Sequence, residues 1–455
     1  MMNSLRDASG RLERREISSV DLTRACLERI AAKNDSLRAF ITVTAEQAMA
    51  EAARADEEIA KERYRGALHG IPVSVKDLVD VTGTPTTSGS NVPPRQPTHD
   101  APVVANLRRA GAVIVGKTNL HEFAFGTTSD ETAFGAVRNP IDTSRSAGGS
   151  SGGAAVALVE RMCYGAVGTD TGGSIRIPAA ACGVVGLKPT SGEISAEAVV
   201  PLSATLDHVG PLGLDVTDAA LLYYAMLDGD ARHDRVPVPA EGPLWLGVPE
   251  PYFLDTVDDE VARLFGDART ALIAAGHSLT TVAVAHAERT ADVYLHIVLP
   301  EASWYHAPLI EAHAGGYSPG VRLRLEMGRY VLAEDYLRAM HARTILRKAV
   351  DRALEGLDAL VLPALAIGAP PLGASTVTIR GHAEPVRATM LRLTQLFNIT
   401  GHPAIALPCG RGRDGLPRAL QLVGHRGGTD RLLAVAAAVE RQIIGGEGSV
   451  GGGAG

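Results

Sequence analysis

The sequence predicts an α/β protein in which a sheet is combined with many helices. Short apolar segments rich in β-branched residues have the character of buried strands, and they alternate with longer segments whose apolar residues have helical spacing. The chain of 455 residues is 45% hydrophobic and 21% charged, which excludes a disordered or fibrous class for most of it. At roughly 150 residues per domain, the length allows about three domains or one large α/β domain.

Helix start signals place the first elements. Ser18 and Asp21 have the spacing of a capping box, in which side chains satisfy the first N–H groups of a helix. Thr44 and Gln47 repeat that spacing before a stretch rich in alanine and glutamate, which favour helices. The elements expected in this part are helices over 18–33, 44–63 and 100–110 and strands over 70–75 and 111–116.

The alternation continues after a loop-rich block at 139–190, in which only 153–161 is expected to be helical. The polar segment 229–243, which contains prolines, fits either a domain boundary or a connection within one sheet. We find no internal repeat. The further expected elements are helices over 216–227, 258–275, 288–313 and 334–355 and strands over 357–362, 403–408 and 419–423.

Charge and composition exclude several classes of function. The formal charge is −7 and no long run of lysine and arginine stands out, so the footprint of a nucleic-acid-binding protein is missing. The N-terminus lacks the apolar stretch of a signal peptide, and the apolar segments are too short to span a membrane. The four cysteines form no Cys-x-x-Cys pair, which is typical of reduced thiols. We therefore expect a cytoplasmic protein without nucleic-acid or membrane partners.

Glycine is enriched in two places. The chain has 49 glycines among its 455 residues, which exceeds the average of about 7%. Eleven of them lie in residues 148–192, where we expect them to allow tight turns or a close approach of the backbone. Seven lie in residues 445–455, which we expect to form a flexible tail.

Three short motifs match known patterns without the required context. Gly111 to Thr118 fits the phosphate-binding loop G-x-x-x-x-G-K-[ST], yet the residues between its glycines are Ala-Val-Ile-Val, a strand that cannot easily wrap a phosphate. Gly148 to Gly152 fits the nucleophile elbow G-x-S-x-G, but a loop precedes it where a strand is needed, and Asp207 and His208 make a poor triad. A zinc-protease pattern begins at His121 but lacks its second histidine.

A further arrangement has a better context for catalysis. Lys76 follows an apolar strand, where removal from water would lower its pKa and let it act as a base. Ser150 and Ser174 each follow a pair of glycines. Gly172 and Gly173 let the backbone turn so that N–H groups point at one spot, as an oxyanion hole requires. A serine–lysine arrangement is an accepted variant of the catalytic triad. From spacing alone, ordinary Gly-Ser turns and a surface lysine explain these residues equally well.

The segment from Gly148 to Thr190 closely resembles the amidase signature of the amidase signature hydrolases. This pattern is long and ordered, so it is far more specific than the short motifs above. The resemblance implies the amidase signature fold, a single large domain over 1–444 with a central mixed sheet flanked by helices, those within 18–63 packing on the core. Further segments that resemble the family, so that nearly the whole chain is covered, are 70–77, 116–126, 206–212, 397–410 and 420–424.

The resemblance also implies a Ser–cis-Ser–Lys triad. Ser174 would be the nucleophile, Ser150 would follow a cis peptide bond and relay the proton, and Lys76 would be the base. The reaction would be hydrolysis of a C–N bond through an acyl-enzyme, without a metal or cofactor. The oxyanion would be held by the backbone of Thr171, Gly172 and Gly173.

Neighbouring residues take further roles by the same resemblance. Substrate binding would fall to Ala124, Phe125 and Gly126, whose apolar character favours an apolar or aromatic acyl group. The rest of the pocket would come from residues 288–395. Residues expected to support the nucleophile without taking part in the chemistry are Ser151, Asp170 and Arg176.

Three features depart from the family pattern. Glu131 stands where many members have asparagine, which places a carboxylate near the expected rim of the pocket. Residues 160–162 stand where many members have small residues, a change expected to affect the helix after Ser151 rather than the chemistry. The segment before Phe397 lacks the Tyr-Leu-x-Asp pattern expected in glutamine-dependent transamidation subunits.

The leading hypothesis is a stand-alone amidase, monomeric or homodimeric, that acts on small amides, with carbamates and esters as further candidates. The alternative is the glutaminase subunit of a tRNA-dependent amidotransferase, which would work bound to a larger partner. A third hypothesis is a non-catalytic or nucleotide-binding protein built around Gly111 to Thr118.

Overall fold

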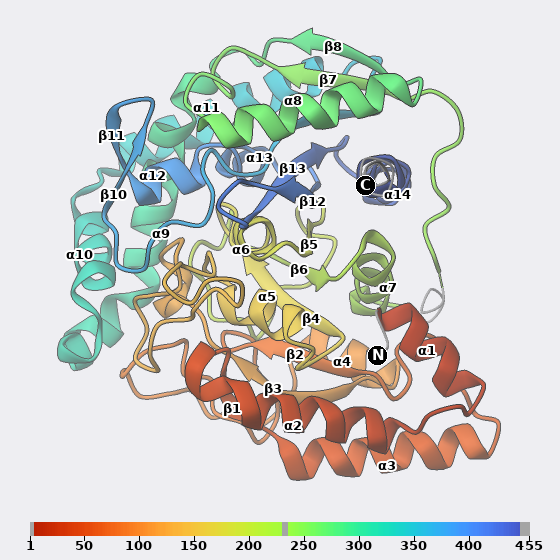
Figure 1. The fold of residues 1–455 in the computed structure, drawn as a ribbon. Helices are drawn as coiled ribbons and strands as arrows, with labels where there is room; N and C mark the ends of the chain where they lie inside the picture. Colours follow the sequence, from red (N-terminus) through yellow and green to blue (C-terminus); the bar gives the residue numbers. More distant parts are fainter. Residues whose placement is uncertain (1–3, 230–234, 446–455) are drawn as a thin grey trace.

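A mixed sheet of eleven strands runs through the part of the chain that the computed structural model describes, residues 4–229 and 235–445 (Figure 1). The order of the strands across the sheet is β1 (Phe40–Val43), β3 (Val113–Thr118), β2 (Pro72–Lys76), β4 (Gly165–Asp170), β6 (His208–Gly213), β5 (Val185–Lys188), β12 (Ala404–Arg411), β13 (Pro417–Val423), β9 (Ala359–Pro363), β7 (Trp245–Pro249) and β8 (Ser278–Val282).

The sheet is parallel near its two ends and antiparallel in its centre. β3, β2 and β4 are parallel to one another, as are β9, β7 and β8. The strands from β4 across to β9 pair antiparallel, and β1 is antiparallel to β3 at the edge. Strands from before and after residues 229–243 belong to this one sheet, so no domain boundary falls there. The predicted α/β fold with a central mixed sheet is confirmed.

The N-terminal helices lie at the end of the sheet formed by β1, β3 and β2, at the bottom of Figure 1. α2 (Ser19–Leu37) and α3 (Ala45–Ala60) pack against each other, and both contact β3. α1 (Leu5–Glu13) and α4 (Pro102–Arg109) pack against α7 (Val216–Met226).

The two predicted capping boxes have different outcomes. Ser18 accepts the Asp21 N–H and donates to the Asp21 carboxylate at 2.7 Å, so the start of α2 is confirmed. The box at Thr44 is wrong, although α3 does begin after it. The Thr44 hydroxyl instead donates to the Ile114 carbonyl of β3 at 2.7 Å, because α3 is packed on that strand.

The block 139–190 is richer in structure than its sequence predicted. Besides the expected helix, α5 (Gly152–Val159), it contains β4, β5 and a second helix, α6 (Arg176–Cys182). Every residue of β4, β5 and α6 is buried. Elements buried on all sides show no alternation of polar and apolar residues, so the periodicity that reveals most elements is absent here.

The second half of the chain supplies helices that cover the sheet. In Figure 1, α9, α10 and α12 and the β10–β11 hairpin lie together on one side, with α7 and α14 on the other. The four helices expected between 216 and 355 are confirmed as α7, α8, α9 and α11. The sequence did not predict the strands β1, β6, β7 and β8 or the last helix, α14. The further elements are α8 (Asp259–Ala274), α9 (Thr290–His313), α10 (Pro319–Met327), α11 (Ala333–Ala353), β10 (Thr376–Ile379), β11 (His382–Pro385), α12 (Val386–Leu391), α13 (Gln395–Thr400) and α14 (Thr429–Gly445), with short 3₁₀ turns η1 (Glu122–Ala124), η2 (Ala287–Arg289), η3 (Ala314–Gly316) and η4 (Gly328–Tyr330).

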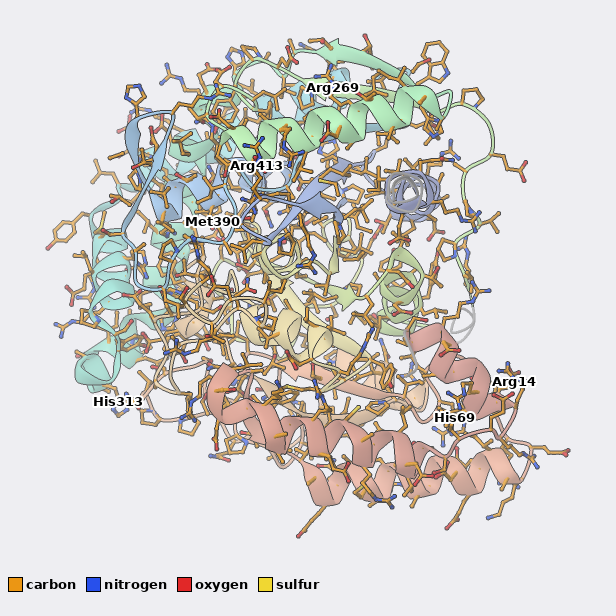
Figure 2. The ribbon with its side chains drawn as sticks, viewed as in Figure 1. Arg14, His69, Arg269, His313, Met390 and Arg413 are labelled. Atoms are coloured by element: carbon orange, nitrogen blue, oxygen red, sulfur yellow. The ribbon has the colours of Figure 1, made fainter. Side chains whose placement is uncertain are left out.

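Side chains fill the space between the helices and the sheet (Figure 2). Met390 of α12 is fully buried, whereas Arg413, in the turn between β12 and β13, is exposed. None of the helices over the described ranges is both long and apolar enough to cross a membrane. The predicted tail 445–455 lies outside the described residues, apart from Gly445 at the end of α14.

Candidate active site

Three parallel strands end together at one edge of the sheet. β2 pairs with β3 on one side and β4 on the other, with Val75 opposite Val167 of β4. Lys76 is the last residue of β2 and Asp170 is the last residue of β4, so both lie at this edge. Ligand sites of α/β proteins lie outside the carboxyl ends of parallel strands, which makes the edge the first place to look for a site.

Lys76 is fully buried, and its amino group contacts hydroxyl groups. Its Nζ donates to Ser150 Oγ and to Thr169 Oγ1, each at 2.8 Å. Burial lowers the pKa of Lys76 to about 7, although the charges of Asp170 and Asp207 act in the opposite direction. Near neutral pH a substantial fraction of Lys76 is therefore uncharged, as a general base must be.

Hydrogen bonds fix both the backbone carbonyl and the hydroxyl of Ser150. The peptide bond between Gly149 and Ser150 is cis, as the resemblance implied. The Ser150 carbonyl accepts hydrogen bonds from the His121 N–H at 3.1 Å and from Ser129 Oγ at 3.2 Å, while its hydroxyl accepts one from Lys76. The backbone contacts and the lysine together fix the position of the Ser150 hydroxyl.

Ser174 lies in the turn between β4 and α6. Its carbonyl accepts a hydrogen bond from the Ser151 N–H at 3.1 Å, so this turn runs directly beside the segment that carries Ser150. Gly173 has a φ of +142°, and a Cβ atom there would lie 2.3 Å from Thr394 Oγ1. Only glycine fits such a position, as the local enrichment in glycine indicated.

The N–H groups of residues 171–174 point at no partner within the protein: none of them donates a hydrogen bond to another described residue. The Gly172 carbonyl accepts a hydrogen bond from Thr394 Oγ1 at 2.6 Å. Because a peptide group is planar and trans, this bond also sets the direction of the Gly173 N–H. Thr171 Oγ1 is held by Asp207 at 2.5 Å. The segment thus offers backbone donors in a fixed arrangement.

Asp170 and Arg176 form a fully buried ion pair behind this turn. Arg176 donates to both carboxylate oxygens, from Nε at 3.0 Å and from Nη2 at 2.9 Å. Its remaining donors reach Asn398, Gln421 and the Thr394 carbonyl. Burial alone would raise the pKa of Asp170, but Arg176 and Asn398 hold it well below its ordinary range. The pair joins the end of β4 to α6 and to the C-terminal half of the chain.

Ser151 links the two serine-bearing segments to β4. Its N–H donates to Ser174, and its hydroxyl donates to the Thr169 carbonyl at 3.2 Å while accepting the Thr169 N–H at 3.4 Å. Thr169 also contacts Lys76. Ser151 therefore holds the surroundings of Lys76 and Ser174 together.

The three residues expected to bind substrate lie in different surroundings. Ala124 lines a cavity of about 220 Å³ together with Thr171. Gly126 lines a second cavity, of about 470 Å³, beside Glu131. Phe125 is only 1% exposed and lines neither cavity; the centre of its ring instead lies 5.5 and 5.7 Å from the guanidinium groups of Arg324 and Arg387.

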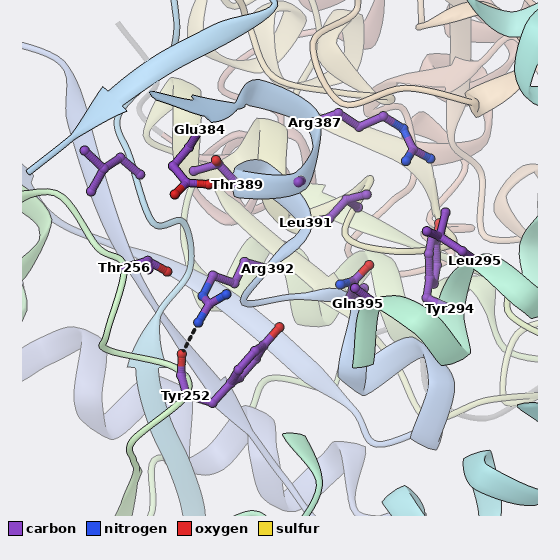
Figure 3. A pocket seen from close by; sticks show the side chains of 13 residues that line it. Tyr252, Thr256, Tyr294, Leu295, Glu384, Arg387, Thr389, Leu391, Arg392 and Gln395 are labelled. Carbon is purple, nitrogen blue, oxygen red and sulfur yellow. Dashed lines mark hydrogen bonds between the residues drawn. The ribbon is translucent and has the colours of Figure 1, made fainter. Parts of the chain in front are cut away.

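A third cavity, of about 220 Å³, adjoins the Gly172 segment (Figure 3). Tyr294 of α9 and Leu391 of α12 belong to its wall, and a Cβ atom at Gly172 would meet their side chains at 2.7 and 3.0 Å. All but two of its lining residues, Tyr252 and Thr256, fall in the segment 288–395.

The Glu131 carboxylate contacts two side chains. Its carboxylate contacts His121 Nε2 at 3.2 Å and accepts a hydrogen bond from Arg324 of α10 at 2.9 Å. The hydrogen bond to His121 is the main cause that lowers the pKa of Glu131 to about 2, and Arg324 adds to it. This departure from the family pattern therefore ties the rim of the second cavity to α10.

The phosphate-loop alternative is wrong. Residues 113–118 form the strand β3, and Lys117 is fully buried in an ion pair with Asp77 at 2.8 Å. The backbone N–H groups of a strand are used in the sheet, and this lysine already has its anion, so no phosphate cradle exists there. The residues before Gly148 form no strand, which also removes the nucleophile elbow.

Sequence reasoning missed several residues that contact Lys76 or the segment before Ser174. Thr169 was assigned to a loop, but it belongs to β4, next to β2, and its hydroxyl accepts a hydrogen bond from Lys76. Thr394 and Asn398 come from the far end of the chain, and no local pattern links them to the turn at Ser174.

Comparison with known proteins agrees with this geometry. The family described as Amidase matches residues 21–433. An amidase of Pseudomonas putida is 40% identical over 429 residues, which are 91% of each chain. A glutamyl-tRNA(Gln) amidotransferase subunit of Geobacter metallireducens is 35% identical over 478 aligned positions, covering 96% of each chain. A crystal structure of an amidase matches with a TM-score of 0.91 at 37% identity, over 97% of this chain and 100% of that chain.

Proposed function

The chain belongs to the Amidase family, and from this premise we propose that it hydrolyses the C–N bond of small amides with Ser174 as nucleophile, Ser150 as proton relay and Lys76 as base. One observation carries the proposal. A buried lysine, its pKa lowered to about 7, donates to the hydroxyl of Ser150 at 2.8 Å. A lysine kept at full charge by a carboxylate would be unable to accept a proton at neutral pH.

The first half of the reaction forms an acyl-enzyme. Neutral Lys76 accepts the Ser150 hydroxyl proton while Ser150 accepts that of Ser174, and the Ser174 oxygen attacks the amide carbon. The C–N bond then breaks, the leaving ammonia or amine takes up the proton returned through the relay, and an ester to Ser174 remains.

The second half releases the acid. A water molecule attacks the ester carbon and gives one proton to the same relay. As the bond to Ser174 breaks, the relay returns that proton to the Ser174 oxygen, which regenerates the free serine and neutral Lys76. In both halves the carbonyl oxygen becomes negatively charged, and the unpartnered N–H groups of residues 171–174 are placed to stabilise it. One such donor is worth roughly 3–4 kcal/mol in comparable sites. Esters and carbamates present the same carbonyl to Ser174 and are further candidate substrates.

The proposal is tested with the purified chain and a panel of aliphatic amides, aryl amides, carbamates, esters and glutamine. We expect release of ammonia or amine from at least one amide, and loss of that activity in Ser174→Ala. Ser36→Ala, an exposed serine near the end of α2, is the matched control and should leave the rate unchanged. Full activity of Ser174→Ala would overturn the proposal.

The glutaminase alternative rests on the 35% identity to a glutamyl-tRNA(Gln) amidotransferase subunit. It predicts that glutamine is the preferred amide and that the chain co-purifies with a larger subunit from its host. The missing Tyr-Leu-x-Asp pattern before Phe397 argues against it. A chain that hydrolyses other amides alone and ignores glutamine would remove this alternative.

A further inference from the structure

The cavity beside Gly172 has three charged residues in its wall, two of them arginines. Its charged lining residues are Arg387 and Arg392 from α12 and the residue after it, and Glu384 from β11. Arg387 also lines the second cavity, the one that contains Gly126. Arg387 thus lines two cavities, and the first of them adjoins the turn before Ser174 through Tyr294 and Leu391.

Arg387 has no anionic partner. No carboxylate among residues 4–229 and 235–445 lies within ion-pair distance of it, and its Nε is buried without a hydrogen-bond partner. Its guanidinium lies 5.7 Å from the centre of the Phe125 ring, which holds it against an apolar wall. Burial lowers the pKa of Arg387, and the charge of Arg324 acts in the same direction. An arginine still keeps its charge at neutral pH.

The other arginines of these cavities are already engaged. Arg324 donates to Glu131 at 2.9 Å. Arg392 donates to the Tyr252 carbonyl at 2.8 Å and lies 4.1 Å from the centre of the Tyr252 ring. In Figure 3, Glu384 lies across the cavity from the guanidinium of Arg387, which extends toward Tyr294 and Leu295. Among the described arginines that line these two cavities, Arg387 is therefore the one whose guanidinium group is available to bind a ligand.

Arg387 lies close to the proposed reacting centre. Arg387 and Tyr294 line the same cavity, and the Tyr294 hydroxyl would lie 2.7 Å from a Cβ atom at Gly172. Leu391, on the same helix as Arg387, also abuts Gly172. A substrate held by Gly172 and its neighbours would reach Arg387 along the wall of Tyr294 and Leu391.

We propose that Arg387 binds a carboxylate of the substrate, so that the enzyme prefers amides that carry a negative charge beyond the scissile bond. A half-buried guanidinium without a partner is costly, and a carboxylate can satisfy it with two parallel hydrogen bonds. The simplest substrates of this class are monoamides of dicarboxylic acids, whose methylene chain would lie against Tyr294 and Leu391. This inference rests on the proposed function and names its substrate class.

The test uses matched pairs that differ only in charge. Succinamate, glutaramate and adipamate are compared with succinamide, glutaramide and adipamide, in which a neutral amide replaces the carboxylate. For the chain length that fits, we expect kcat/KM for the carboxylate to exceed that for the diamide by about tenfold or more, after correction for the two equivalent amides. We also expect the corresponding dicarboxylate to inhibit competitively.

Variants then assign the preference to Arg387. Arg387→Met should lower kcat/KM for the carboxylate by about tenfold or more and weaken inhibition by the dicarboxylate, with the diamide rate within about twofold. Arg387→Glu should reverse the preference in favour of a cationic amide such as 5-aminopentanamide. Arg392→Met removes a charge from the same wall and should leave the ratio of the two rates unchanged.

The outcomes separate this inference from the proposed function. Equal or better use of the diamides by the unaltered chain, or an unchanged preference in Arg387→Met, would overturn the carboxylate site while Ser174-dependent hydrolysis still stands. Hydrolysis of none of the amides in this set, with no inhibition by any dicarboxylate, would also overturn it. If Ser174→Ala remains fully active, the proposed function itself fails.

Discussion

Two buried cations lie at the same edge of the sheet and have opposite surroundings. Lys76 contacts the hydroxyls of Ser150 and Thr169, whereas Arg176 is bound to both oxygens of Asp170 and to further acceptors. Burial lowers the pKa of Lys76 to about 7, so its charge is easily lost. The partners of Arg176 keep that pair charged. Both cations are fully buried, so the partners and the lower ordinary pKa of a lysine, rather than the depth of burial, separate the reactive cation from the structural one.

The largest effect should follow from removing Lys76 or Ser174. Lys76→Met and Ser174→Ala should each lower kcat by about 10⁴-fold or more, because members of a triad act as one unit. Combining them should cost little more than either alone, which steady-state kinetics of the double variant would check. Additive losses would mean that the two residues do not act together.

Arg176, the structural cation, should instead affect the stability of the fold. Arg176→Met leaves the Asp170 carboxylate buried and unpaired, so we expect the free energy of unfolding to fall by about 3–5 kcal/mol. Urea denaturation followed by circular dichroism measures this change. Arg263→Met, which breaks two ion pairs on the surface of α8, is the control and should cost less than about 1 kcal/mol. Equal effects of the two variants would break the comparison.

The pH dependence of activity should report Lys76. Because its protonated form cannot accept a proton, kcat/KM should fall about tenfold per pH unit below about 7 and level off above it. Asp207, whose pKa burial raises to about 6, also titrates in this range, so the profile of Asp207→Asn is the control. Because the Asp207 charge raises the pKa of Lys76, the break should persist in this variant but move below its position in the unaltered chain. A profile that stays flat from acidic to alkaline pH would contradict a lysine base.

A smaller effect should come from Thr169→Val, which keeps the shape of the side chain but removes one acceptor of the Lys76 hydrogen bonds. Losing that acceptor disfavours the charged form, so the break in the pH profile should move below that of the unaltered chain. We expect kcat at high pH to fall by about tenfold or less. A break that moves upward would show that Thr169 does not stabilise the charged lysine.

Much of the fold and the candidates for the triad could be predicted from sequence. Helices such as α2 and α8 have one exposed face, and their periodicity is visible. Lys76, Ser150 and Ser174 stand in long motifs with little freedom of interpretation. Elements buried on every side, such as β4 and α6, have no such pattern and were missed.

What could not be predicted is mostly long-range. Thr394 meets Gly172 across 222 positions, and Arg324 meets Glu131 across 193, so neither contact has a local signal. Arg387 is also unremarkable in the sequence, since only the arrangement of its neighbours shows that it lacks an anion. Substrate preference depends on contacts of this kind.

The most direct measurement is the site of covalent modification by a serine-directed sulfonyl fluoride. After reaction, intact-mass analysis and peptide mapping locate the label. We expect one label per chain on Ser174, absent in Ser174→Ala and strongly slowed in Lys76→Met. A label on Ser150 or another residue, with Ser174 unmodified, would contradict it.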